Sequence, residues 1–129
     1  MIDFHNHILP NVDDGSKSVE MSLNMLREAE SQGITDVVNT VHYQHPKMEG
    51  KNTSYDFIIS EISKLQSIAN KNNINVKIHP GSEVFFNYNL TKILDNPITT
   101  IGNGKYMLIE FQTLSFPKDY EETIFELQT

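Results

Sequence analysis

Strand-like and helix-like segments alternate along this chain, and that order limits the folds it can adopt. Apolar residues recur at helical spacing in four segments: residues 18–32, 53–72, 90–94 and 117–127. β-Branched or alternating apolar residues mark four strands before and between them: residues 1–4, 34–41, 74–78 and 105–111. Strand and helix in repeated succession predict parallel strands joined by crossover helices, so the predicted fold class is α/β. A barrel and an open sheet both fit this pattern.

Single residues predict where some of these elements begin and end. Ser18 is a suitable N-cap for the helix at 18–32, and Gly33 is its expected stop. The strand at 74–78 is expected to close at Pro80-Gly81, since this dipeptide favours a turn.

Composition excludes several classes of function. The chain has 129 residues, the size of one modest domain, and a net charge of -7, which argues against a nucleic-acid-binding surface. It has no cysteine, which excludes disulfides, thiolate metal sites and cysteine nucleophiles. Any metal ion would therefore bind nitrogen and oxygen ligands, a donor set that fits manganese, iron, zinc or magnesium. The sequence has no long apolar run and starts without a signal-peptide pattern, so we expect a cytoplasmic protein with no membrane insertion.

Chemically active side chains follow the predicted strands, at the ends where α/β folds bind their ligands. His5 and His7 come first, and because residues i and i+2 of a strand share a face, both imidazoles point the same way. Imidazole is the commonest protein ligand of zinc-like metals. The candidate metal ligands are three imidazoles and three carboxylates: His5, His7, Asp14, His42, Glu83 and Glu110.

Each candidate also has a simpler structural interpretation. An isolated His-x-His is more often a surface pair, Asp14 before a glycine fits a turn, and His42 fits a satisfied histidine at a strand end. Glu83, after Pro-Gly, fits a solvated position. Glu110 lies within Met-Leu-Ile-Glu-Phe and must be exposed or paired, because a buried unpaired charge is strongly destabilising. All six at the same end of consecutive strands are much harder to explain by chance than any one alone.

Two further histidines are predicted to lie outside this set. His45, beside Pro46 in a loop, is expected to be exposed. His79 follows Ile78 in a predicted strand and is expected to have a structural or surface role.

Five stretches of the sequence resemble the polymerase-and-histidinol-phosphatase (PHP) superfamily of metal-dependent phosphoesterases: MIDFHNHI at 1–8, VDDG at 12–15, TVH at 40–42, GSEV at 81–84 and LIEF at 108–111. They appear in family order, with family-like spacing, across essentially the whole chain. More narrowly, the chain resembles the bacterial PHP-type protein-tyrosine phosphatases of capsule and exopolysaccharide operons, because its Asp-Asp-Gly block is similar to theirs. Histidinol phosphatases tend to carry a histidine where Asp14 stands.

This resemblance implies a distorted (β/α)7 barrel around a site of up to three divalent metal ions, with manganese expected first and iron, zinc or magnesium as alternatives. The motifs assign ligands to three ions: His5, His7 and Glu83 to the first, Glu83 and Glu110 to the second, and Asp14 and His42 to the third. Asp14 is also the expected catalytic residue, because it could assist proton transfer to the leaving tyrosine oxygen.

The chain departs from the family in its second half. Later family motifs, a histidine beside a phosphate-binding arginine and an Asp-x-His, have no match after Glu110, and no histidine follows His79. We therefore expect residues 1–129 to be a single incomplete PHP domain, the N-terminal half of a longer fold.

The function implied by the resemblance is that of a metal-dependent phosphotyrosine-protein phosphatase, which hydrolyses a phosphomonoester with hydroxide generated by its metal ions. The expected substrate is the phosphorylated tyrosine tail of a partner bacterial tyrosine kinase. Two alternatives stay open. One is another PHP phosphoesterase, such as a histidinol phosphatase. The other is a non-catalytic half-barrel that binds a partner, or forms a homodimer or domain-swapped pair, through uncovered sheet edges and apolar surface.

Overall fold

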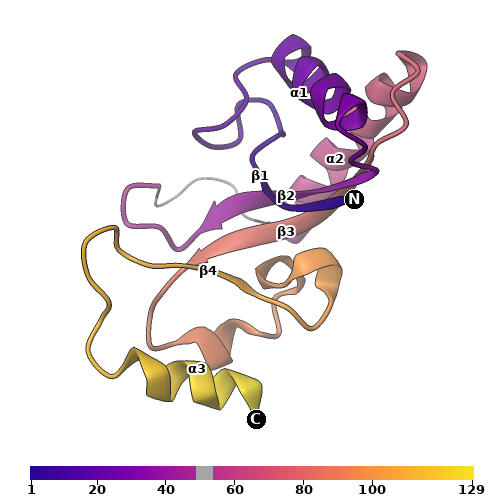
Figure 1. The fold of residues 1–129 in the computed structure, drawn as a ribbon. Helices are drawn as coiled ribbons and strands as arrows, with labels where there is room; N and C mark the ends of the chain where they lie inside the picture. The colour runs from indigo at the N-terminus through magenta and orange to yellow at the C-terminus, as the bar shows by residue number, and fades with distance from the viewer. Residues whose placement is uncertain (49–53) are drawn as a thin grey trace.

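The computed structural model describes residues 1–48 and 54–129 as one four-stranded parallel sheet with helices (Figure 1). The strands are β1 (Ile2–Asn6), β2 (Asp36–Tyr43), β3 (Lys77–Phe85) and β4 (Leu108–Glu110). The α-helices are α1 (Val19–Ser31), α2 (Tyr55–Lys71) and α3 (Tyr120–Gln128). Three short 3-10 helices link β3 to β4: η1 (Leu90–Ile93), η2 (Pro97–Thr99) and η3 (Ile101–Asn103). The predicted α/β class and the parallel strands are confirmed.

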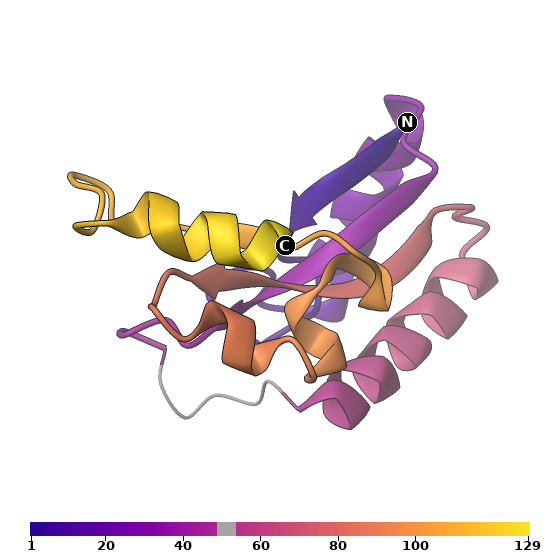
Figure 2. The ribbon, with the colours of Figure 1, turned by 90° about the horizontal axis from the view of Figure 1, so that it is seen from below.

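The sheet order β1-β2-β3-β4 repeats the order of the strands in the chain. When each crossover is right-handed and the order does not reverse, successive helices fall on the same face of the sheet. One apolar core accordingly combines Leu26 of α1 and Leu65 of α2 with Val37 and Val41 of β2. The result is a curled half-barrel rather than a doubly wound sheet (Figure 2).

Serine side chains cap the starts of the two long helices, and the first of these helices begins where the sequence predicts. The Ser18 hydroxyl accepts a hydrogen bond from the Met21 N–H, and Gly33 follows the helix with a φ of 79°, a left-handed conformation that glycine adopts without strain. Ser54 caps α2 in the same way, and residue 53 of the predicted helix lies outside the described residues. Within the described ranges, none of the helices is both long enough and apolar enough to cross a membrane.

The predicted end of the third strand is wrong. The strand does not close at Pro80-Gly81 but continues to Phe85, paired with β2 from Lys77 to Val84. Proline is tolerated there because β4 pairs only with Glu83–Phe85, so at Pro80 none of the described strands lies on that side of β3. The fourth strand is also shorter than predicted, and only its Leu108–Glu110 part pairs.

The face of the sheet opposite the α1–α2 core has two chemically different ends. Residues alternate along a strand, so Asp36 and His42, six residues apart on β2, lie on the same face about 20 Å from each other. In the β2–β3 register, His79 is paired near the first end and Glu83 is paired directly with His42 at the second. This second end, where the strands terminate, is where the predicted ligands meet.

Candidate metal centre

Parallel strands bring the predicted ligands to one edge of the sheet. His5 lies on β1, His42 on β2, Glu83 on β3 and Glu110 on β4. The two others come from the loop that follows β1. All six fall into three overlapping groups, each with ligand atoms within 4.8 Å of one another: His5, His7 and Glu83; His7, Asp14 and His42; His42, Glu83 and Glu110.

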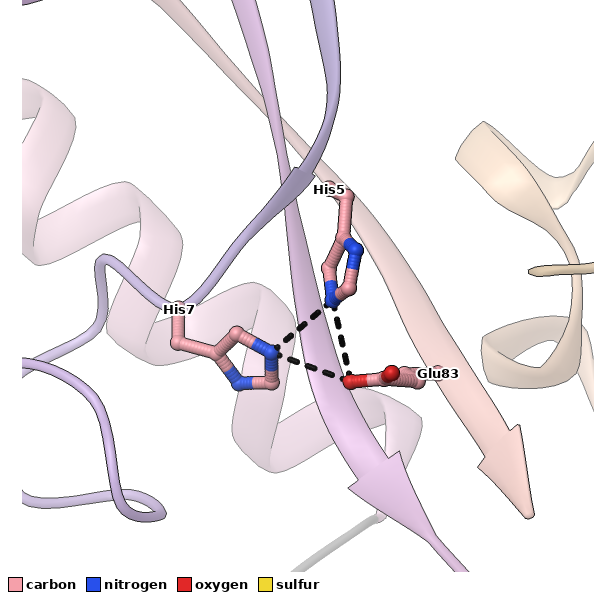
Figure 3. Close-up of side chains that lie close together, drawn as sticks. All are labelled: His5, His7 and Glu83. Carbon is pink, nitrogen blue, oxygen red and sulfur yellow. Dashed lines mark hydrogen bonds and ion pairs between the residues drawn. The ribbon is translucent and has the colours of Figure 1, made fainter. Parts of the chain in front are cut away.

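One oxygen of Glu83 lies at the centre of the arrangement. Its Oε2 is 3.0 Å from Nε2 of His5 and 3.1 Å from Nε2 of His7, and these two nitrogens are 3.3 Å apart (Figure 3). The same oxygen is 3.6 Å from Nδ1 of His42. The three side chains in Figure 3 point toward one another from β1, the loop after it and β3.

His42 connects this group to the other two carboxylates. Its Nε2 is 3.2 Å from Asp14 Oδ1, and its Nδ1 is 3.4 Å from Glu110 Oε2. Both atoms of the second pair are buried, and neither has a hydrogen-bond partner among the described residues. Buried polar atoms normally have a partner, so this pair marks a position that a further group should occupy.

Asp13 contacts a candidate ligand, His7, and the sequence interpretation missed it. It is buried, and its Oδ2 accepts a hydrogen bond from Nδ1 of His7 at 2.7 Å, while its Oδ1 accepts one from the Gly15 N–H. With its proton on Nδ1, neutral His7 carries a lone pair on Nε2, the nitrogen that faces His5 and Glu83. The signal was present in Asp-Asp-Gly, but the sequence alone does not tell which aspartate faces the histidine.

Charges around His7 alter the pKa values of both partners. Burial on its own lowers the pKa of His7, but the hydrogen bond to Asp13 and the charges of Asp13, Glu83 and Asp14 outweigh it and raise the pKa above the ordinary imidazole value. Burial on its own raises the pKa of Asp13, but the hydrogen bonds from His7 and Gly15 outweigh it, so the pKa of Asp13 is lowered. Without a cation, this cluster therefore attracts a proton.

Gly15 allows the loop to pass close to His7. A Cβ at this position would lie 2.2 Å from the His7 carbonyl oxygen and 2.3 Å from the His7 Cβ, too close for any side chain. The adjoining Ser16 N–H donates to the same carbonyl at 3.0 Å. The glycine of Asp-Asp-Gly thus lets the aspartates reach the end of β1.

The remaining histidines divide between the two ends of the sheet. His79 pairs with Asp36 at 2.8 Å, which confirms its predicted place outside the site. The prediction for His45 is wrong: its side chain is only 14% exposed, and its Nε2 lies 3.5 Å from Glu110 Oε1. The turn after β2 folds His45 back onto the site, and a sequence pattern that identifies a loop does not predict the direction of that loop.

The donor set fits divalent cations. With neutral imidazoles, three carboxylates give the six side chains a formal charge of −3, which a cation would offset. The Nε2 lone pair of His7 faces an acceptor oxygen, an arrangement that needs a proton or a cation between the two atoms. Mixed nitrogen and oxygen donors suit manganese, iron or zinc.

Comparison with known proteins identifies relatives along the whole chain. A family model described as "Capsular polysaccharide synthesis, CpsB/CapC" matches residues 1–129. The chain is 35% identical over 120 residues to the tyrosine-protein phosphatase CpsB of Streptococcus agalactiae, covering 92% of this chain and 48% of that protein. It is 29% identical over 129 residues to the tyrosine-protein phosphatase YwqE of Bacillus subtilis, covering 99% of this chain and 50% of the relative.

A solved structure has the same arrangement of elements. Its description covers crystal structures of YwqE from Bacillus subtilis and CpsB from Streptococcus pneumoniae and calls both metal-dependent tyrosine phosphatases. The match has a TM-score of 0.90 and 30% sequence identity. The match covers 99% of this chain and 51% of that chain. The chain thus spans about half the length of the relatives it matches.

Proposed function

The chain belongs to the CpsB/CapC family of capsular polysaccharide synthesis, and from that premise we propose that the protein is a metal-dependent phosphotyrosine-protein phosphatase. The observation that carries the proposal is the convergence of three imidazoles and three carboxylates at the strand ends, with buried, unpartnered atoms on His42 and Glu110 among the described residues. This convergence supports a multinuclear metal centre, and the relatives' names and the solved structure's description support the reaction class.

In this proposal the ligands serve up to three ions, as the motifs predict. His5, His7 and Glu83 would hold the first, Glu83 and Glu110 would hold the second with His42 beside them, and Asp14 and His42 would hold the third. His7 belongs to the first group, because Asp13 occupies its Nδ1 and leaves only Nε2 free. Manganese is the first candidate, with iron, zinc or magnesium as alternatives.

When bound, such ions lower the pKa of a water molecule and offset the charge on the phosphoryl oxygens. The chain's own residues have three tasks in this chemistry. Glu83 holds the imidazoles of His5 and His7 at one point, Asp13 fixes the tautomer of His7, and the sheet keeps the carboxylates in register. These positions are set by strand pairing and burial before any substrate arrives.

We assign Asp14 a second task, proton transfer to the leaving tyrosine oxygen. Its side chain is 60% exposed, against 12% for Glu83 and 24% for Glu110. It is thus the carboxylate of the set most open to an incoming substrate. Since Oδ1 faces His42, the other oxygen is the one available for the proton.

The substrate, the location and the extent of the domain are parts of the same proposal. The substrate would be the phosphorylated tyrosine tail of a bacterial tyrosine kinase, and the location the cytoplasm. Residues 1–129 would be one part of a PHP domain whose remaining ligands lie in the other half of the relatives' length. A metal centre built by two halves of a barrel would bind its ions weakly when either half is missing.

The test is release of inorganic phosphate from a phosphotyrosine peptide by the longest native form of the protein, with and without manganese. We expect activity that a chelator abolishes and manganese restores, and that His5→Ala and Glu83→Ala both lack. Activity that survives chelation would contradict the proposal. Histidinol phosphate serves as the competing substrate, and faster turnover of it would favour the other PHP phosphoesterases.

A second candidate is a non-catalytic module that pairs with another copy of the chain. One observation favours it: a hollow lined by Phe4, Ile101, Tyr106, Met107 and Leu108 is mostly apolar. Tyr106 is 80% exposed there, and exposed apolar surface of this kind promotes association. Sedimentation of the 129-residue chain decides, since a dimer supports the module and a stable monomer counts against it.

A further inference from the structure

His45 is placed against the metal centre by a turn that its neighbours fix. Gln44, with a φ of 48°, donates hydrogen bonds through its side-chain amide to the Phe85 carbonyl and to Asn89 Oδ1. After Gln44 the chain turns over 45–48, with Pro46 in the second position and the Met48 N–H donating to the His45 carbonyl at 2.9 Å. The imidazole lies edge-on to the Phe85 ring, with centroids 5.1 Å apart. These contacts hold the ring in one orientation.

The same turn fixes the tautomer of His45. The Lys47 N–H donates to Nδ1 of His45 at 3.1 Å, so Nδ1 must carry the lone pair. The ring proton of the neutral imidazole is then on Nε2. That nitrogen is 3.5 Å from Oε1 of Glu110, which places a donor beside a carboxylate oxygen.

The two oxygens of Glu110 therefore face different partners. Oε1 faces His45, whereas Oε2 faces Nδ1 of His42 at 3.4 Å and is one of the buried atoms without a partner in the described part of the chain. A ligating carboxylate is commonly held by a hydrogen bond to the oxygen that does not bind the metal. His45 lies where such a partner would be.

We propose that His45 is a positioning residue of the metal centre: its Nε2–H orients Glu110 through Oε1 and leaves Oε2 directed at the cation. The inference rests on the proposed metal centre and adds to it a residue that none of the three ligand groups contains. His45 acts through Glu110 and binds no ion itself. Its ring, 5.0 Å from that of His42, also limits the space on that side of the site.

The test is manganese binding by the longest native form of the protein, measured by calorimetry for wild type, His45→Ala, His45→Gln and His79→Ala. We expect His45→Ala to weaken one binding equilibrium by about 10- to 100-fold, the usual effect of losing an outer partner of a ligand, with the number of bound ions unchanged. His45→Gln, whose amide can donate from a similar place, should recover most of that affinity. His79→Ala removes another histidine–carboxylate pair, the one with Asp36, and should bind as wild type does.

Each alternative outcome has its own meaning. Equal affinity for wild type and His45→Ala would overturn the role of His45 alone, whereas no binding by wild type would overturn the metal centre itself. Loss of one ion in His45→Ala, without recovery in His45→Gln, would make His45 a ligand and overturn the positioning role. If the variants do not fold, the nitrogen NMR shifts of wild-type His45 decide. Nε2–H is the expected tautomer, and Nδ1–H would overturn the proposal.

Discussion

Two histidine–carboxylate groups lie at opposite ends of the same sheet face, and they differ in what they leave unsatisfied. At the start of β2 and β3, His79 pairs with Asp36 at 2.8 Å, and Asp36 also accepts a hydrogen bond from the Thr35 hydroxyl. At the ends of β2 and β4, His42 and Glu110 keep buried atoms without partners among the described residues. The protein itself satisfies the first pair, whereas the unpartnered atoms of the second pair need a further group.

The comparison indicates which property distinguishes the proposed metal centre from an ordinary ion pair. A histidine near a carboxylate is common to both ends, so proximity does not separate them. At the strand ends, Glu83 Oε2 meets three imidazole nitrogens within 3.6 Å, and one of these, Nδ1 of His42, has no hydrogen-bond partner among the described residues. A cation would satisfy this excess of acceptor atoms at a partly buried site.

The largest effect is expected from Glu83→Ala. Glu83 belongs to two of the three ligand groups, so its loss should weaken manganese binding by more than about 100-fold, beyond the loss seen for outer partners of ligands. Calorimetric titration of the longest native form of the protein measures this loss. Asp36→Ala is the matched control at the other end of the sheet, and binding by Glu83→Ala equal to that of the control would contradict the site.

A smaller effect is expected from Asp13→Ala. Without the acceptor for Nδ1, His7 can adopt the tautomer with its proton on Nε2, which no longer presents a lone pair to the ion. We expect manganese affinity to fall by about 10- to 100-fold, and by less in Asp13→Asn, whose side-chain oxygen can still accept the bond. Unchanged affinity in Asp13→Ala would show that the pair has no role in orienting His7.

These residues also show how far the sequence predicts the molecule. Period-2 and helical patterns depend on which face of an element is buried, so they predicted the α/β class and the convergence of the six ligands. The path of a loop depends on tertiary contacts such as the bond from Gln44 to the Phe85 carbonyl, and for that reason the sequence interpretation placed His45 in solvent. Asp13 and Asp14 are the same amino acid at adjacent positions, and only the folded loop determines where each side chain points.

The next largest effect is that of pH. A rise in pH through the His7 pKa should lower the stability of the metal-free chain and raise its affinity for metal. The pKa of His7 is raised in the folded chain, so in the metal-free chain its pairing with Asp13 stabilises fully below the ordinary imidazole pKa, and this contribution is lost as pH rises through the folded pKa. The pKa of Asp13 is lowered, so its contribution is present above the ordinary aspartate pKa and is lost on acidification through the folded value.

Metal binding should follow the reverse trend, because an ion must displace the His7 proton. Affinity should rise by up to about tenfold per pH unit below the His7 pKa and level off above it, as for one linked proton. Calorimetry in buffers of different ionisation enthalpy counts the protons released. Binding that is independent of pH between about 5.5 and 7.5, on either side of the ordinary imidazole value, would contradict this role of His7.

The smallest effect is expected from Asp36→Asn, which changes the His79–Asp36 pair at the other end of the sheet face. The pKa of Asp36 is lowered by the hydrogen bonds from His79 and Thr35, so the pair contributes a little stability above the ordinary aspartate pKa and loses it as pH falls through the folded value. Because Asp36 lies about 20 Å from His42 along β2 and shares no partner with it among the described residues, manganese affinity should change less than about twofold. Urea unfolding at pH 7 and pH 3 measures the first effect, and calorimetry measures the second. A large loss of manganese affinity would mean that the two ends are coupled through the sheet, and the distinction between an ion pair and a metal centre would then not hold.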